Sequence, residues 1–555
     1  MTTTARHGSD RKSVGGRSIR WSDERAAAAY AKGHWVHTTL ADALRDAARD
    51  TPARVVVVDG DVRLGCLDLH VRAQALAAAL SDRMPVGSAV SFMLPNWHEA
   101  AVVYLGATLA GMVVNPILPS LRDHELRFIL DDVDSRTIFV PGEFRGHDYS
   151  AMLSRVTDAL DSPPEVVVVR AAPGPHTAYA DLFGSGQEAP AVTLDPDAVR
   201  MIMYTSGTTG RPKGVLHTHN SIHALIRQLG AHWRIDSGDT FLVPSPIAHI
   251  GGSIYAFELP LLLGTKAVLM ETWNADDAVT LMRTHGCTHM AGATPFLQQL
   301  LAAAENAQTR LPDLKVFICG GASVPPSLIR RAASYFERAA VSRVYGSTEV
   351  PVTTVGALDD PDAAADTDGR PGIADVWLVA RDPGGMGGQT GEIHARGAQM
   401  LVGYLHPEDE AESFDCDGYF CTGDIGTWGG DALVVTGRAK DIIIRNGENI
   451  SPKEVEDILI GHPDIVEVAV VGLPDARTGE RACAVIVPAS DPGPDVAALR
   501  EFLEGHGVAK FKVPERVAVW DALPKNDAGK VLKHRIRAAL EVGRGERSDG
   551  NYKGG

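Results

Sequence analysis

Short runs of β-branched residues alternate with Ala- and Leu-rich stretches along most of the chain. A Val-rich run at 54–58 is followed by an Ala-rich stretch at 73–80 and by another apolar run at 89–94. Continuous apolar runs of this length, separated by helical stretches, are typical of strands buried on both faces of a parallel sheet. The pattern therefore predicts layered α/β architecture and disfavours an all-helical or all-β fold.

The longest apolar run covers residues 101–114 and ends at Asn115 and Pro116. It is shorter than the roughly 20 residues that a helix needs to cross a bilayer. We expect instead a buried helix that runs into a strand. No fixed-period repeat accompanies the alternation, which disfavours a solenoid or a propeller.

A change of pattern at residues 437–441 predicts a domain boundary. Beyond it, we expect a helix at 452–459, with Ser451 as its N-cap. A hairpin is expected from the apolar runs at 466–471 and 482–487. The unit after the boundary has about a hundred residues, which is a usual domain size.

The chain is therefore expected to be an α/β protein with a large N-terminal body of layered α/β subdomains and a small mobile α+β lid domain at the C-terminus. The body is assigned to residues 21–438 and the lid to residues 439–541. Residues 1–20 and 542–555 are polar and rich in Gly, Ser and charge, so we predict that both are disordered tails.

Composition narrows the functional class. The 555 residues carry a formal net charge of −17, which disfavours binding to nucleic acid or to an anionic membrane, because phosphates attract basic surfaces. The six cysteines are scattered without close pairs, which disfavours both a disulfide framework and a zinc site. No signal-peptide pattern opens the chain. These features together predict a cytoplasmic protein without integral membrane contact.

A Gly- and Thr-rich segment at 204–214 directly follows an apolar strand at 199–203. Its glycines let the backbone bend, and its hydroxyls, its amides and Lys213 can donate hydrogen bonds to phosphate oxygens. It is not a Walker A loop, because Gly214 stands where that motif has Ser or Thr. From these residues alone, a phosphate-binding loop and a flexible turn are equally good interpretations.

The same segment resembles a motif of the adenylate-forming superfamily, which includes acyl-CoA synthetases, adenylation domains of peptide synthetases and luciferases. The resemblance covers nearly the whole chain, from about residue 38 to about residue 540. It implies ATP-dependent activation of a carboxylic acid to an acyl-adenylate, followed by transfer to coenzyme A, which gives acyl-CoA, AMP and pyrophosphate. The further motifs that carry it lie, in family order, at 320–322, 345–349, 419–424, 437–441 and 524–530.

The resemblance also assigns a nucleotide site. Thr205 and Glu349 would act in catalysis by sharing a Mg²⁺ ion, which prefers carboxylates and substrate phosphates as ligands. Tyr345 would stack on adenine, and Asp424 would accept hydrogen bonds from the ribose hydroxyls beside Arg438. The full set expected to contact ATP or AMP is Thr205, Ser206, Gly207, Thr208, Thr209, Gly210, Lys213, Gly320, Gly321, Ala322, Tyr345, Gly346, Ser347, Thr348, Asp424, Arg438 and Lys530.

Lys530 is the residue expected to promote adenylation. A cation there would offset the repulsion between the attacking carboxylate and the α-phosphate. By the same resemblance the lid rotates about Lys440, so that one orientation inserts Lys530 and the other opens a tunnel for the CoA thiol past Asn446 and Gly447. Asn446 departs from the family, which often has two glycines here, and its side chain would narrow the tunnel.

By resemblance, the acid pocket is lined by His249, Ile250, Gly251, Ser253 and Val350. No acidic residue in these segments is placed to pair with an amino group, which disfavours amino-acid substrates. Hydroxybenzoate-activating relatives commonly have a polar residue where this chain has Ile250, which disfavours salicylate-type acids. The chain is most like acyl-CoA ligases for medium-chain, alicyclic or aryl acids, and we expect an apolar acid of that kind.

Two alternatives remain open. An acid-AMP ligase would pass the acyl group to the phosphopantetheine thiol of an acyl carrier protein instead of CoA. A non-catalytic nucleotide-binding module would share the fold, although such a module has no need for Lys530.

Three histidines, His217, His219 and His223, follow the Gly- and Thr-rich segment. A metal cluster is one interpretation of this spacing. They have no carboxylate or Cys partner at a zinc spacing, so we expect surface or supporting histidines instead.

Overall fold

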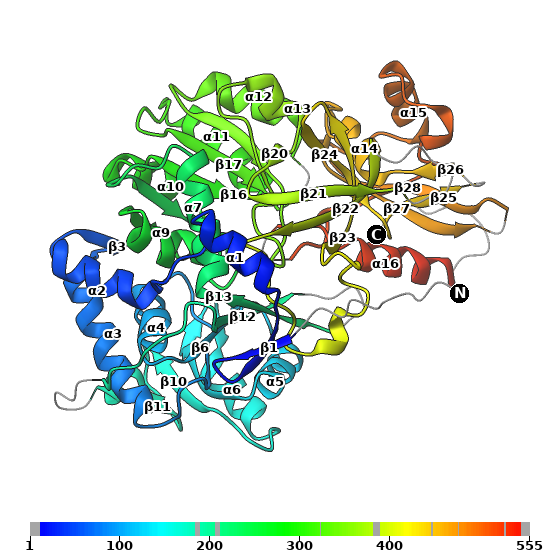
Figure 1. Cartoon of the computed structure of the whole chain (residues 1–555). Coiled ribbons are helices and arrows are strands. Elements are labelled where there is room, and N and C mark those ends of the chain that lie inside the picture. Colours follow the sequence, from blue (N-terminus) through cyan, green and yellow to red (C-terminus); the bar gives the residue numbers. More distant parts are fainter. Residues whose placement is uncertain are drawn as a thin grey trace.

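The chain forms a mixed α/β body and a small C-terminal lid domain, which confirms the predicted fold class (Figure 1). Two seven-stranded sheets make up most of the body, and a four-stranded sheet lies between them and the lid. The computed structural model describes residues 11–183, 189–205, 211–321, 324–380, 389–445, 448–475, 477–526 and 529–545.

The first seven-stranded sheet is parallel except for its last strand, which turns back along its neighbour. The predicted run at 89–94 forms one of its central strands. Its spatial order is β11 (Thr177–Ala178), β10 (Glu165–Val169), β7 (Ser135–Pro141), β5 (Ala89–Phe92), β6 (Val113–Pro116), β12 (Val199–Thr205) and β13 (Lys213–Thr218). The helices that follow its strands are α4 (His98–Leu109), α5 (Asp123–Asp132), α6 (Tyr149–Thr157) and α7 (His219–His232).

The second seven-stranded sheet repeats this design, with one antiparallel strand at its end. Its order is β18 (Ala340–Val344), β17 (Val316–Gly320), β16 (His289–Gly292), β14 (Thr240–Val243), β15 (Lys266–Leu269), β3 (Val55–Asp59) and β4 (Val62–Gly65). The helices between its strands are α3 (Cys66–Ser81), α8 (Ile250–Ser253), the π-helix η2 (Ile254–Glu258), α9 (Leu259–Leu262), α10 (Ala275–His285), α11 (Thr294–Asn306) and α12 (Pro326–Tyr335), and α13 (Pro361–Asp366) follows the last strand. Helix α2 (Leu40–Asp50) precedes them.

Helix α4 is the centre of the core. Every residue of α4 except Glu99 is buried, and the helix contacts strands of both large sheets as well as α3. A helix that is apolar on all sides has to be enclosed in this way. The run at 101–114 therefore forms a buried helix and then strand β6, as the pattern predicts.

The lid is a separate sheet flanked by helices. The predicted helix and hairpin are confirmed, with Ser451 accepting a hydrogen bond from the backbone of Glu454 at the start of α14. The lid contains β25 (Ile443–Arg445), β26 (Glu448–Ile450), β27 (Ile465–Asp475), β28 (Gly479–Pro488), β29 (Arg516–Val519), α14 (Pro452–Leu459), α15 (Val496–Gly505), η4 (Lys510–Lys512) and α16 (Lys533–Gly545). The four-stranded sheet next to it comprises β21 (Ala374–Val379), β22 (Thr390–Gly397), β23 (Phe420–Gly429) and β24 (Ala432–Arg438).

The remaining elements are short. They are α1 (Asp23–Ala31), η1 (Tyr179–Leu182), η3 (Pro407–Glu410), and the two-stranded pairs β8 (Glu143–Phe144) with β9 (His147–Asp148) and β19 (Thr354–Val355) with β20 (Arg370–Pro371). The predicted boundary after residue 438 falls in the turn between β24 and β25, and the division into two moving parts stays a prediction.

The prediction that residues 1–20 form a disordered tail is wrong for residues 11–20. They make a β-hairpin of β1 (Arg11–Val14) and β2 (Arg17–Arg20). Gly15 and Gly16 form its turn with φ of 58° and 82°, a conformation that glycine adopts without strain. A two-residue Gly-Gly turn is a hairpin signal, which the polar composition of the segment concealed.

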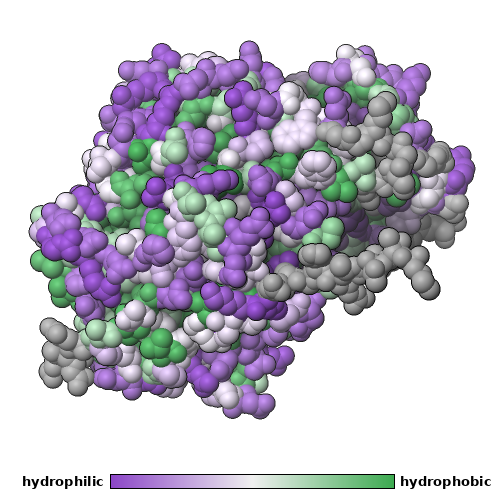
Figure 2. Space-filling model, viewed as in Figure 1, coloured by the Kyte–Doolittle hydropathy of each residue, from purple (hydrophilic) through white to green (hydrophobic). Residues whose placement is uncertain are grey.

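The prediction that residues 542–555 form a tail is wrong at its start, because α16 runs to Gly545. Within the described ranges, no helix is long and apolar enough to cross a bilayer. On the face seen in Figure 2, hydrophobic residues form small areas separated by hydrophilic ones.

Candidate active site

The candidate phosphate loop leaves the first sheet at its carboxyl edge. Thr205 ends β12 and Lys213 begins β13, and the two residues are paired across the antiparallel ladder. The strand pair therefore fixes both ends of the loop at one place. Five residues assigned to the loop lie outside the described residues, namely Ser206, Gly207, Thr208, Thr209 and Gly210.

Thr205 and Glu349 lie together, as the sequence predicts. The Thr205 hydroxyl donates to Glu349 Oε1 over 3.4 Å, and the hydroxyl of Tyr404 donates to the same oxygen over 3.2 Å. The backbone of Glu349 is also fixed, because its carbonyl accepts from the Leu401 amide at 2.7 Å. Neutral donors at these distances leave the carboxylate free to bind a cation, so the oxygens fit a Mg²⁺ ion. Burial and the nearby carboxylate of Glu349 raise the pKa of Tyr404, which keeps its hydroxyl a donor.

A second cluster joins Tyr345, Asp424 and Arg438. The Tyr345 hydroxyl donates to Asp424 Oδ2 at 2.8 Å, and Arg438 Nε donates to Oδ1 at 2.9 Å. The Asp424 carboxylate is thus held from both sides. Each carboxylate oxygen can accept a further hydrogen bond, which is what reading a ribose diol requires.

Tight backbone packing shapes the segment that carries Tyr345 and Glu349. A Cβ on Gly346 would lie 2.5 Å from the Val352 amide nitrogen, and a Cβ on Gly320 would lie 2.5 Å from a Val344 methyl group. Larger residues would therefore displace the backbone at these positions. Of the neighbouring predicted residues, Gly321 has φ of 82° and Ser347 accepts from the Val350 amide at 3.2 Å, whereas Ala322 lies outside the described residues.

His217 and His219 are both buried, so neither is a surface histidine, and His217 is a supporting histidine of this segment, as the second of the two expected interpretations has it. His217 Nε2 lies 2.7 Å from the Thr348 carbonyl oxygen, and Nδ1 lies 3.1 Å from the Ser221 hydroxyl. Burial lowers the pKa of His217 to about 4, so the imidazole is neutral near pH 7 and donates to Thr348. His223 is half-buried.

Lys530 reaches the body from the lid. Its turn is closed by Asn526, whose side-chain oxygen accepts from the Lys530 amide at 2.8 Å, and Gly529 lies at φ of 77° against Pro295 of the body. The residue stays exposed, while surrounding protein atoms and then Arg438 lower the pKa of its ammonium. The Asp424 carboxylate acts on the same ammonium in the opposite sense and raises its pKa. The turn that carries Lys530 therefore faces the body on the side of Asp424 and Arg438.

The predicted hinge residue lies between the body and the lid. Lys440 is exposed in the turn that joins β24 to β25. Asp441 beside it is paired with Arg537 of α16 at 2.7 Å. Asn446 and Gly447 lie outside the described residues, between the paired strands β25 and β26.

The predicted acid-pocket residues divide into two groups. His249 is exposed, and its pKa is lowered by nearby protein atoms and then by the charge of Lys530. Gly251 follows it and donates its amide to His249 Nδ1 at 3.3 Å. Ile250 and Ser253 are buried in α8, and Val350 is buried in a core cluster with Tyr404.

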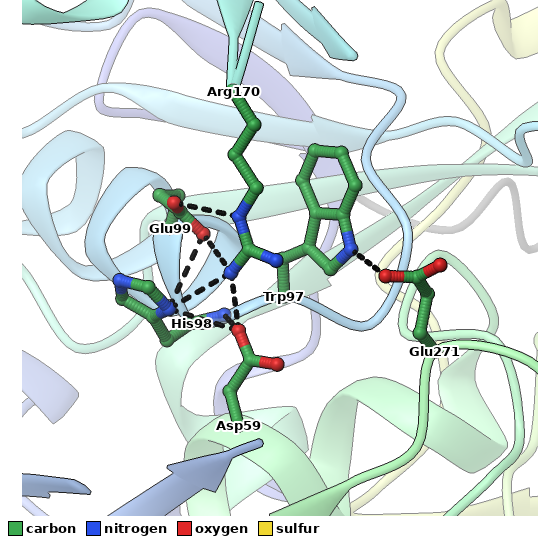
Figure 3. Close-up of polar contacts among 6 residues, drawn as sticks. All are labelled: Asp59, Trp97, His98, Glu99, Arg170 and Glu271. Atoms are coloured by element: carbon green, nitrogen blue, oxygen red, sulfur yellow. Dashed lines mark hydrogen bonds and ion pairs between the residues drawn. The ribbon is translucent and has the colours of Figure 1, made fainter. Parts of the chain in front are cut away.

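A separate group of potential metal ligands lies where Asp59 ends β3 and where His98 and Glu99 open α4. Arg170 Nη2 donates to Asp59, lies 2.7 Å from Glu99 Oε2 and lies 3.0 Å from His98 Nδ1 (Figure 3). The guanidinium therefore occupies the space between the three ligand atoms, and its plane covers Trp97 at 4.3 Å. We interpret the group as an ion-pair cluster that joins the two large sheets.

Tyr404 is a supporting residue that sequence reasoning missed. It lies in no charged motif, and it acts through a contact with Glu349, which is far away in sequence. The one available signal was the aromatic residue in the segment 403–405, which gives no chemistry by itself.

Polar side chains at the carboxyl edges of two α/β sheets, faced by a lysine-bearing turn of a separate domain, are the arrangement expected of an adenylate-forming enzyme. The family described as AMP-binding enzyme matches residues 44–405, and the AMP-binding enzyme C-terminal domain matches residues 454–530. The chain belongs to the AMP-binding enzyme family and is an adenylate-forming acid ligase.

The relatives include both CoA ligases and an AMP ligase. The chain is 32% identical to a medium-chain fatty-acid–CoA ligase of Escherichia coli over 94% of both chains. It is 35% identical to a methyl-dioxo-octahydroindenyl-propanoyl:CoA ligase of Rhodococcus jostii, over 90% of this chain and 98% of the relative. It is also 30% identical to a 2,3-dihydroxybenzoate-AMP ligase of Bacillus subtilis, over 94% and 97%.

Solved structures agree with the fold. ATP-bound MatB from Rhodopseudomonas palustris is 27% identical and superposes with a TM-score of 0.80, over 91% of this chain and 99% of that one. A fatty acyl CoA synthetase of Mycobacterium tuberculosis is 28% identical with a TM-score of 0.70, over the same shares.

Proposed function

We propose that this protein is an acyl-CoA ligase that activates an apolar carboxylic acid with ATP and transfers the acyl group to coenzyme A. The observation that carries the proposal is that the lid turn with Lys530 faces Pro295 and Ala293 of the body, and that Arg438 and Asp424 lie near enough to act on the pKa of its ammonium. A cation between a nucleotide cluster and an acid pocket suits the joining of two anions.

In the first half-reaction, a carboxylate oxygen of the acid attacks the α-phosphorus of ATP, and the bond from that phosphorus to the pyrophosphate oxygen breaks. Lys530 offsets the repulsion between the carboxylate and the phosphate as they approach. Thr205 and Glu349 would hold Mg²⁺, which would neutralise charge on the phosphates. The Asp424 carboxylate orients the ribose.

In the second half-reaction, the lid turns about Lys440. The thiol of CoA loses its proton, its sulfur attacks the acyl carbonyl carbon, and AMP leaves with the electrons of the broken acyl–oxygen bond. Support for CoA as acceptor comes from the two CoA ligases of Escherichia coli and Rhodococcus jostii, which match this chain over nearly their full lengths.

The acid is apolar in this proposal. Ile250 follows His249, is only 6% exposed and belongs to the large core cluster that also contains Ile254 and Tyr255. An apolar tail would extend that cluster, whereas a charged tail would lose its hydration there.

The test measures pyrophosphate and AMP release with ATP, Mg²⁺ and a panel of carboxylic acids, each with and without CoA. Thioester formation that needs one apolar acid and CoA is the expected result. No acid-dependent pyrophosphate release would overturn the proposal and leave a nucleotide-binding module.

A carrier protein is the second candidate acceptor. The observation that favours it is the similarity to the 2,3-dihydroxybenzoate-AMP ligase and to a salicyl-AMP ligase / salicyl-S-ArCP synthetase of Mycobacterium tuberculosis, which is 32% identical over 94% of this chain. Acid-dependent pyrophosphate release with no CoA thioester, together with acylation of a phosphopantetheinylated carrier, would establish this function instead.

A further inference from the structure

The N-terminal hairpin packs on the strands that hold the phosphate loop. Val14 and Ile19 are 5% and 0% exposed and lie in one core cluster with Val199 and Ile202 of β12 and Leu216 of β13. Figure 1 shows the hairpin, in dark blue, beside the yellow segment that contains η3. The hairpin is thus part of the body and packs against β12 and β13, the two strands that flank the phosphate loop.

Two arginines of the hairpin converge on one carboxylate. Arg11 Nη1 donates to both oxygens of Glu410 at 2.9 Å, and Arg20 Nη1 donates to Oε2 at 3.1 Å. The side chain of Glu410 is 8% exposed, and those of Arg11 and Arg20 are 25% and 16% exposed. The backbone amide of Arg20 also donates to the Val402 carbonyl at 2.7 Å. The hairpin is therefore bonded at two points to the segment that contains Val402 and Glu410.

Glu410 connects the hairpin to the candidate metal ligand. Its Oε1 accepts from the Tyr404 amide at 3.1 Å, and the Tyr404 hydroxyl donates to Glu349 Oε1 at 3.2 Å. A carboxylate that fixes the backbone of Tyr404 also limits where its ring can point. Direct contacts therefore connect the two arginines to Glu349 by way of Glu410 and Tyr404.

The neighbour of Glu410 connects the same segment to the exit of the phosphate loop. Asp409 Oδ1 accepts from Arg211 Nη2 at 2.7 Å, and its carbonyl oxygen accepts from Lys213 Nζ at 3.2 Å. The ammonium of Lys213 also lies over the ring of Tyr404 at 5.1 Å. A shift of η3 would thus move both the loop exit and Tyr404.

We propose that the hairpin β1–β2 is a positioning element of the nucleotide site. Arg11 and Arg20 hold Glu410 in place. Glu410 and its neighbour Asp409 thereby fix the positions of Tyr404, of Glu349 and of the residues that directly follow the phosphate loop. The inference rests on the proposed role of Glu349 in the ATP site. Without its two arginines, Glu410 would be a nearly buried charge with no cation, and such a group moves toward water. That movement would draw Tyr404 away from Glu349.

The test uses the full chain with Arg11→Gln and Arg20→Gln combined. MgATP binding is measured by calorimetry without any acid, and the Mg²⁺ dependence of adenylation is measured separately. The expected result is a roughly tenfold weaker binding of MgATP and a Mg²⁺ midpoint moved to higher concentration, with thioester formation from a presynthesised acyl-adenylate unchanged. The Arg11→Lys, Arg20→Lys pair should restore most of the loss, because the ion pairs remain possible.

Arg155→Gln is the matched control, since Arg155 makes an exposed paired contact with Asp123 elsewhere on the body. If the double Gln variant does not fold, Tyr404→Phe tests the same path with the hairpin intact and should move the Mg²⁺ midpoint in the same direction. Unchanged MgATP binding and midpoint would overturn the inference, as would equal loss in both half-reactions. A wild-type chain that binds MgATP but releases no pyrophosphate with any acid would instead contradict the proposed function, while the binding comparison would still test the hairpin.

Discussion

The two halves of the candidate site are built differently. In the body, Glu349 and Asp424 are each held by hydroxyl or guanidinium donors from other strands and segments. In the lid, Lys530 sits on a turn that is closed mainly by its own neighbour Asn526 and touches the body through Gly529. Among the described residues, the two carboxylates of the body are held by donors from other segments, whereas the hydrogen bonds of Lys530 join it to Asn526 of its own turn.

This difference suggests a division of labour. Groups held from several sides are suited to bind a nucleotide in one pose, because little ordering remains to be done on binding. A group held by a few contacts can leave the site with little loss of free energy. A lid that serves two half-reactions needs its residues to leave in this way. Body residues should then govern nucleotide binding, while lid residues should govern individual chemical steps.

The largest expected effect is on Lys530. Lys530→Ala should slow adenylate formation by roughly a thousandfold, because the cation that offsets the two approaching anions is lost. Thioester formation from a presynthesised acyl-adenylate should be unchanged. Single-turnover pyrophosphate release and thioester formation measure the two steps separately.

Lys525→Ala is the control for this variant, since Lys525 lies in the same turn but is paired with Glu467 on the lid. It should leave both steps at the wild-type rate. Equal losses in both half-reactions for Lys530→Ala would contradict the division of labour.

Glu349→Gln tests the body half. The amide keeps the shape and can accept from Thr205 and Tyr404, but it is a poor ligand for Mg²⁺. We expect adenylation to fall by roughly a hundredfold at fixed Mg²⁺, with partial recovery at higher Mg²⁺. Glu305→Gln, which alters an exposed ion pair with Arg331, is the control. A loss that does not respond to the Mg²⁺ concentration would argue against a metal-binding role for Glu349.

Lys440→Pro tests the connection between the halves. Proline fixes φ in the turn between β24 and β25, so the lid should turn less readily. Thioester formation should slow by roughly tenfold while adenylation is kept, because Lys530 already lies at the site. Lys440→Ala should behave like the wild type. An unaffected second step in the proline variant would rule out Lys440 as the hinge.

Local pattern and motif predicted most of the fold. The buried helix α4, the strands β3 and β5, and the α14 helix with its Ser451 cap follow from apolar runs and capping residues that lie within a few positions of one another. The pairs Thr205–Glu349 and Asp424–Arg438 were also anticipated, because resemblance places these residues in one site.

Contacts between distant segments were the part that sequence could not supply. The hairpin at 11–20 reads as a polar tail because only Val14 and Ile19 point to the core, and its ion pairs reach Glu410 almost four hundred positions away. Sequence alone could not decide between a surface and a supporting role for His217 for a similar reason, since its contact with Thr348 joins segments 131 positions apart. Polar residues whose partners are remote carry no local signal of burial.

The smallest expected effect is a difference in pH dependence between the two half-reactions. Surrounding protein atoms, and then Arg438, lower the pKa of Lys530 below its ordinary value of 10.5, so its ammonium loses the proton at a lower pH than a free lysine. Adenylation needs that cation and should therefore decline severalfold on the alkaline side before pH 10.5 is reached. Thioester formation from a presynthesised acyl-adenylate does not use Lys530 and should lack this decline.

The Lys530→Arg variant sharpens the same comparison, because a guanidinium stays charged through this range. The adenylation rate that this variant retains should stay constant across the pH range in which the wild-type rate falls. Rates of both half-reactions, measured across the alkaline range after confirming that the protein stays folded, check the prediction. An identical alkaline decline in both half-reactions of the wild type would assign the titration to a group shared by both steps, and the lid would then contribute no charge of its own to adenylation.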